Sequence, residues 1–147
     1  MSDTPVTARY HATTVAVDGA AVMITGPSGS GKSALALELI GLGASLVADD
    51  LSQIEIQDGE PYAVAPPEMA GVIEARGVGL INVSHCSKAH LRLVVDMGQI
   101  ETARLPSSPA VTDVNGCAIE CLFRVDAPYF AIAIVNLLRN GRRAIQN

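Results

Sequence analysis

Residues 26–33 have the types and the spacing of a loop that binds phosphate. They read Gly26-Pro27-Ser28-Gly29-Ser30-Gly31-Lys32-Ser33. This satisfies the pattern G-x-x-x-x-G-K-[ST], in which glycines let backbone N–H groups curl around an anion at a helix N-terminus. Lys32 could then reach the β- and γ-phosphates of a nucleotide, and the Ser33 hydroxyl could ligate Mg²⁺. We predict a nucleotide site, and the alternative is a glycine-rich turn without a ligand.

Two adjacent acidic residues, Asp49 and Asp50, come directly after the short apolar run Ser45–Ala48. In phosphate-loop proteins a second strand commonly delivers a carboxylate to the Mg²⁺–phosphate site. One acid could hold Mg²⁺ through water while the other accepts a proton from an incoming hydroxyl group. The pair predicts acid–base chemistry beside the loop, and the alternative is an exposed Asp-Asp turn at a strand end.

Four further polar residues are candidates for the same site. Glu74 and Arg76 stand in the apolar, glycine-punctuated segment 72–83, where a charged pair could bind Mg²⁺ and phosphate. The alternative there is a surface turn with an incidental salt bridge. His11 is a lone histidine before the first predicted strand, and is otherwise a surface residue. Arg104 could serve as a transition-state arginine, although most arginines in loops have no such role.

The phosphate loop is expected between a strand and a helix. Apolar and β-branched runs at Thr13–Val17 and Ala20–Thr25 flank an Asp-Gly pair, which predicts a β-hairpin. Helix formers with an apolar face follow at Ser33–Leu42, and Ser45–Ala48 predicts a short buried strand. This order of strand, loop, helix and strand is the context that a nucleotide-binding loop needs.

Short strands separated by turn residues are predicted over the rest of the chain. Strands are indicated at Gln53–Gln57, Val78–Val83, Leu91–Asp96 and Ala118–Phe123, with hairpin turns at Asp58-Gly59 and Asn115-Gly116. The prolines at 61, 66 and 67 predict an edge strand or a loop. We expect an irregular surface segment at residues 98–114, and a helix at 128–141, between Pro128 and Gly141. Strands outnumber helices, so we expect an α/β fold with a mixed sheet and few helices.

Composition narrows the class of protein. The 147 residues fit one domain, 1–147, and 49% hydrophobic with 17% charged residues excludes a disordered chain. The net charge of −5 and only 3% aromatic residues argue against a nucleic-acid partner or an anionic membrane surface. Three cysteines without a CxxC spacing predict free thiols, and no signal peptide or membrane-spanning run is visible. We expect a cytoplasmic protein.

Together these segments resemble the catalytic domain of HPr kinase/phosphorylase, a serine kinase of the phosphotransferase system. The resemblance lies in His11 at the start of the hairpin, in GPSGSGKS with the following LALELIGLGASLVADD, and in ETARLP. The segment IEARGVGLINV is similar to the family's Glu-x-Arg-Gly-x-Gly signature. The expected catalytic core is 11–139. The resemblance is to the short form of the family in α-proteobacteria, so we expect a chain without the usual N-terminal regulatory domain.

This resemblance implies a P-loop fold similar to that of phosphoenolpyruvate carboxykinase, and a role for each catalytic candidate. Asp49 would be the general base that activates the target serine of HPr, with His11 tuning it. Asp50 and Arg104 would complete the catalytic set. Protonated Asp49 would assist the reverse, phosphorylase reaction with inorganic phosphate.

The cofactors implied by the resemblance are ATP and Mg²⁺, and the implied partner is HPr. ATP would be bound by residues 26–33 and Arg76, whereas Mg²⁺ would be held by Ser33, Glu74 and Asp50. The resemblance leaves open whether phosphorylase activity, a homo-oligomer and effector control are retained. Two other functions stay open: a small-molecule kinase on the same fold, and a nucleotide-binding switch that is not an enzyme.

Overall fold

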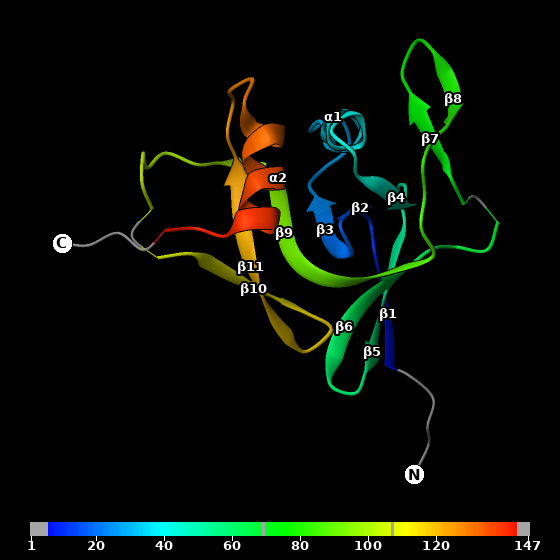
Figure 1. The fold of residues 1–147 in the computed structure, drawn as a ribbon, viewed down its shortest axis with the longest axis horizontal. Helices are drawn as coiled ribbons and strands as arrows, with labels where there is room; N and C mark the ends of the chain where they lie inside the picture. Colours follow the sequence, from blue (N-terminus) through cyan, green and yellow to red (C-terminus); the bar gives the residue numbers. More distant parts are fainter. Residues whose placement is uncertain (1–5, 69, 107, 144–147) are drawn as a thin grey trace.

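The computed structural model describes residues 6–143 except 69 and 107, and its main element is a mixed sheet of nine strands (Figure 1). The order along the sheet is β1 (Val6–Tyr10), β5 (Ser52–Gln57), β6 (Glu60–Val64), β9 (Lys88–Ile100), β3 (Ala20–Thr25), β2 (Thr13–Val17) and β4 (Ser45–Ala48). At β9 the sheet also pairs with β11 (Cys117–Arg124), which carries β10 (Ala110–Val114). The long, curved β9 therefore joins all parts of the sheet.

Three of these strands, β3, β9 and β11, are parallel neighbours. The first part of β9 lies between β6 and β3, and its second part lies between β11 and β3. Thr25 at the end of β3 is the partner of Asp96 on β9. The glycine-rich loop that follows Thr25 is therefore placed beside the residues that follow Asp96.

The three predicted hairpin turns are confirmed. In each turn both central residues have a positive φ, the geometry that matches the right-handed twist of the two strands. The residues are Asp18 (49°) with Gly19 (83°), Asp58 (53°) with Gly59 (78°), and Asn115 (50°) with Gly116 (87°). They join β2 to β3, β5 to β6 and β10 to β11.

The two helices pack on one face of the sheet. α1 (Lys32–Gly41) and α2 (Phe130–Asn140) share a hydrophobic core with apolar residues of β2, β3 and β9. The opposite face carries a second core, to which the β5–β6 and β10–β11 hairpins contribute Ile54, Ala63, Val114 and Ile119. α1 begins at Lys32, directly after the glycine-rich loop, and its contacts with β2 and β3 hold its first turn beside that loop.

Both predicted helices are confirmed, with ends that differ by no more than two residues from the expected bounds. Within the described part of the chain, neither is long and apolar enough to cross a membrane. The prediction of free thiols is also confirmed, because Cys86, Cys117 and Cys121 form no disulfide.

A separate hairpin of β7 (Val72–Ala75) and β8 (Gly79–Asn82) projects from the molecule beside α1 (Figure 1). Its base is anchored by Ile73, which is fully buried in the helix-side core. Val78 and Leu80, near the turn, are 78% and 68% exposed. The hairpin thus reaches from the core to solvent while carrying the segment of Glu74 and Arg76.

Two predictions about the strands are wrong in part. Within the proline-rich stretch, β6 is an interior strand and not an edge, whereas Pro66 and Pro67 do lie in a loop. β9 pairs only with Tyr62–Val64, so Pro61 lies one residue beyond that contact. Residues 98–114 are not wholly irregular, because β9 continues to Ile100 and Ala110–Val114 forms β10 against β11. For β6 and the end of β9, pairing with a distant strand overrides the local composition, whereas β10 forms through its hairpin with β11.

Candidate active site

The loop at residues 26–31 connects β3 to α1, so the strand–loop–helix context predicted for it is confirmed. Gly31, with φ of 98°, precedes the first helical residue Lys32. Gly26 is packed so closely against β9 that a Cβ there would lie 3.1 Å from the Gly98 nitrogen. A side chain at Gly26 would therefore displace the loop from β9, and only glycine fits this approach.

Lys32 and Ser30 are the polar side chains that mark this loop as an anion site. The Lys32 Nζ donates hydrogen bonds to the carbonyl oxygens of Gly26 at 2.8 Å and Pro27 at 3.1 Å. The ammonium group therefore lies over the loop, where the N–H groups of the first helical turn also concentrate positive potential. The Ser30 hydroxyl is buried and has no hydrogen-bond partner among the described residues. Both features fit a loop built to receive phosphate oxygens.

The carboxylate of Asp49 is the point where four distant segments meet. Its Oδ1 accepts hydrogen bonds from the Thr13 hydroxyl at 3.0 Å and the Ser33 hydroxyl at 3.3 Å. Its Oδ2 accepts the backbone N–H of Glu74 at 3.3 Å. The start of β2 lies beside the end of β4, since Thr14 is paired with Ala48. The predicted approach of an acidic strand end to the phosphate loop is thus confirmed by the Asp49–Ser33 contact.

Asp50 has a different environment from its neighbour. It is exposed, with a positive φ of 70°, and makes no hydrogen bond or ion pair with any described residue. The left-handed backbone costs an aspartate about 1–2 kcal/mol and is uncommon outside glycine. The structure therefore separates the two acids: Asp49 is held by donors, and Asp50 is free to bind an external group.

The β7–β8 hairpin brings Glu74 to the site through its backbone, while the Glu74 side chain is exposed. Arg76 is exposed in the turn that follows β7. No salt bridge joins these two side chains in the described part of the structure, so the incidental salt bridge of the alternative interpretation is wrong, although Arg76 does lie in a surface turn.

His11 lies close to the Asp49 cluster, whereas Arg104 does not. His11 is exposed and lies two residues before Thr13, at the edge of the Asp49 cluster. Arg104 is exposed in the segment after β9, and Figure 1 shows this yellow-green segment running out on the side of α2 opposite to α1. It makes no hydrogen bond or ion pair with a described residue, and nothing in this structure brings it to Asp49.

Two residues that the sequence analysis did not select contribute to the site. Thr13 is buried and holds Asp49, but no local pattern distinguishes it from other threonines in strands. Asp96 ends an apolar strand run as Asp49 does, and that same signal could have found it. Its Oδ1 accepts the N–H of Gly98 at 2.8 Å, which holds the part of β9 that packs against Gly26.

Fold and loop together define this chain as a phosphate-loop domain on a mixed sheet. The family model of the HPr Serine kinase C-terminal domain matches residues 4–120, and the chain belongs to this family. The resemblance inferred from the sequence is thereby confirmed.

Relatives and a solved structure agree with the family assignment. The chain is 45% identical over 76 residues to an HPr kinase/phosphorylase of Clostridium beijerinckii, and 46% identical over 76 residues to that of Clostridium perfringens. Each match covers 52% of this chain and 25% of the relative, so the chain matches about a quarter of these proteins. The HPr(Ser) kinase/phosphatase structure from Coxiella burnetii superposes with a TM-score of 0.76 at 23% identity, covering 90% of this chain and 89% of that one. This similarity confirms the predicted fold class.

Proposed function

We propose that this chain is an ATP-dependent kinase that phosphorylates a serine of an HPr-type phosphocarrier protein. The observation that carries the proposal is the Asp49 carboxylate, held within hydrogen-bonding distance of the Ser33 hydroxyl of the phosphate loop. A base so close to a phosphate site is the arrangement that phosphoryl transfer to a hydroxyl group requires. The relatives named above are HPr kinases, which supports the same substrate class.

The residues of the site fit bound Mg²⁺-ATP, which would supply the phosphoryl group and its leaving group. The N–H groups of residues 26–33, Lys32 and Arg76 would bind phosphate oxygens, and the unpartnered Ser30 hydroxyl would gain a partner there. Ser33, Glu74 and Asp50 offer hydroxyl and carboxylate oxygens, the donors that Mg²⁺ prefers.

Asp49 would accept the proton of the attacking serine. Its Oδ1 already accepts two hydroxyl groups, whereas Oδ2 accepts one backbone N–H, so Oδ2 keeps more capacity for a further proton. As the new bond to phosphorus forms at the serine oxygen, the bond to the leaving oxygen of ADP breaks and the serine proton passes to Asp49. Protonated Asp49 returns that proton in the reverse reaction with inorganic phosphate.

The remaining roles are also proposals. His11, at the edge of the Asp49 cluster, would tune the charge of Asp49, and Arg104 would stabilise transferring charge only if its segment moves to the site. We infer that residues 1–147 form one domain, with the catalytic core at 11–139. We also infer that the protein acts in the cytoplasm on a protein partner and can form a homo-oligomer.

The test is a phosphotransfer assay with purified protein, Mg²⁺-ATP and HPr from the same organism, read by the mass of HPr. The wild type should add one phosphoryl group to a serine. Asp49→Asn should lower the rate by about 10²–10⁴-fold, the usual contribution of a general base, while ATP binding persists. Asp58→Asn, an exposed change in a tight turn that tolerates asparagine, is the matched control.

Three outcomes of this assay contradict parts of the proposal. An unchanged rate in Asp49→Asn removes Asp49 as the base. Phosphoryl transfer to a small molecule but not to HPr favours a metabolite kinase. Tight ATP binding with no transfer to either acceptor favours a nucleotide-binding switch.

A further inference from the structure

A pocket of about 680 Å³ lies between the end of α2 and strands β9 and β11, away from the phosphate loop. Its apolar wall includes Leu93, Leu137 and Leu138, and its charged wall includes Arg92, Arg139 and Arg142. Ala20, at the start of β3, lines the pocket, whereas the phosphate loop follows the other end of β3. The five steps from Ala20 to Thr25, at about 3.3 Å each, separate the pocket from the start of the phosphate loop by about 17 Å.

Two of the three arginines are paired with acids. The Arg139 Nε lies 2.9 Å from Asp18, and both terminal nitrogens of Arg142 donate to Glu120 at 3.2 and 2.9 Å. The hydrogen bonds to Glu120 raise the pKa of Arg142, so its guanidinium stays charged. Cations near the C-terminus of a helix are favoured by its dipole. The Arg139–Asp18 and Arg142–Glu120 pairs are therefore explained as structural contacts and do not by themselves indicate a ligand.

Arg92 is different, because it has no acidic partner among the described residues although it lines the same pocket. It is the extra residue of a β-bulge: Ala21 pairs with Leu91 and Val22 pairs with Leu93. Bulges re-aim side chains and disrupt the ladder locally. Arg92 therefore has no partner residue on β3, and it is this unpaired residue that lines the pocket with its guanidinium group.

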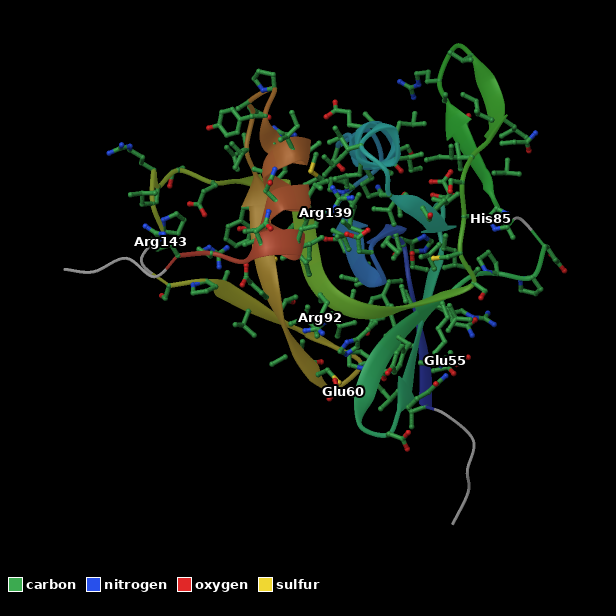
Figure 2. The ribbon with its side chains drawn as sticks, viewed as in Figure 1. Glu55, Glu60, His85, Arg92, Arg139 and Arg143 are labelled. Atoms are coloured by element: carbon green, nitrogen blue, oxygen red, sulfur yellow. The ribbon has the colours of Figure 1, made fainter. Side chains whose placement is uncertain are left out.

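The bulge also changes which face of the sheet the neighbouring side chains occupy. Leu91 belongs to the core on the side of the β5–β6 hairpin, whereas Leu93 belongs to the core beneath the helices. Figure 2 shows Arg92 on β9, below Arg139 on α2. Arg92 thus lines the same pocket as the end of α2, and its side chain is exposed to solvent there.

We propose that this pocket binds a small organic anion, with a phosphate or carboxylate group held by Arg92 and an apolar body resting on the leucines. A guanidinium fork matches both anions through two parallel hydrogen bonds. Three arginines against Asp18 and Glu120 give the pocket a net charge of +1 within a chain of net charge −5. The volume lies in the range of small-molecule sites. No residue of the phosphate loop takes part, so the inference stands independently of the proposed kinase activity.

The test uses ¹⁵N-labelled protein titrated with benzoate, phenyl phosphate, inorganic phosphate and benzyl alcohol. Backbone N–H shifts at 137–141 report the pocket, and those at 29–33 report the phosphate loop separately. Benzoate and phenyl phosphate should both shift the pocket amides, each at lower concentration than inorganic phosphate or benzyl alcohol. Comparing the two ring-bearing anions tells whether carboxylate or phosphate is preferred.

Arg92→Gln is the decisive variant, and Arg9→Gln, which removes an exposed arginine on β1, is the matched control. Loss of the fork should weaken binding in the pocket about tenfold or more, whereas Arg9→Gln should bind as the wild type does. If Arg92→Gln unfolds, Arg92→Lys replaces it and should still weaken binding. Absence of shifts at 137–141, or shifts unchanged by loss of Arg92, overturns the proposal. Equal affinity for benzoate and benzyl alcohol also overturns it, because the charge would then play no part.

Discussion

Replacing Gly26 with alanine measures the close approach of the phosphate loop to β9. The new Cβ would lie 2.7 Å from the Ser30 hydroxyl oxygen and 3.1 Å from the Gly98 nitrogen. The serine side chain can rotate, but the Gly98 nitrogen belongs to the backbone and cannot move without shifting the end of β9. Gly29→Ala is the matched control, since Gly29 also has a positive φ, of 81°, with no atom within 4 Å of a Cβ.

The expected free-energy change follows from these two terms. A positive φ in the left-handed region costs alanine about 1–2 kcal/mol, and this cost is no smaller at Gly26, whose φ of 137° lies farther from that region than the 81° of Gly29. Alanine restricts the unfolded chain equally in both variants. Overpacking against fixed atoms adds about 1–3 kcal/mol at Gly26 alone. Gly26→Ala should therefore lower the free energy of unfolding by about 1–3 kcal/mol more than Gly29→Ala does.

Urea unfolding followed by far-ultraviolet circular dichroism is the suitable assay, because the chain has no tryptophan. The slope of the free energy against urea must be the same in all variants for the comparison to hold. Equal destabilisation by Gly26→Ala and Gly29→Ala would refute the reasoning, since the contact with β9 would then contribute nothing.

Three further predictions concern other contacts of the fold. Thr13→Val removes one of the hydroxyl donors to Asp49 without changing side-chain size and should cost about 1–2 kcal/mol in urea unfolding; an unchanged midpoint contradicts it. Tyr10→Phe leaves the backbone N–H of Asn115 without its 2.8 Å acceptor and should cost about 1 kcal/mol, which an unaltered urea curve would disprove. Burial raises the pKa of the Cys121 thiol, so the folded chain holds the thiol proton more tightly than the unfolded chain does. The protonated thiol therefore contributes to the free energy of unfolding below the ordinary thiol pKa, and this contribution is lost as the pH rises above it. Cys121→Ser should therefore flatten the alkaline loss of stability, and a wild-type pH profile in that variant counts against this cause.

Much of the fold was predictable because it depends on neighbours in the chain. The pairs Asp18-Gly19 and Asn115-Gly116 predict tight turns, since both central residues must adopt a positive φ that few residue types tolerate. The loop at 26–33 was equally clear, because its glycines, lysine and serine are contiguous. The strand–loop–helix order around it could be read from local periodicity.

The sequence by itself determined the phosphate loop, the hairpin turns, the two helices and the family resemblance. Only the tertiary structure decided that Asp49 receives hydrogen bonds from Thr13, Ser33 and Glu74, which lie 36, 16 and 25 residues away in the chain. It also decided that Arg92 is the bulged residue of β9. The physical reason is that periodicity tells which face a side chain occupies, whereas strand partners and register depend on contacts between distant segments.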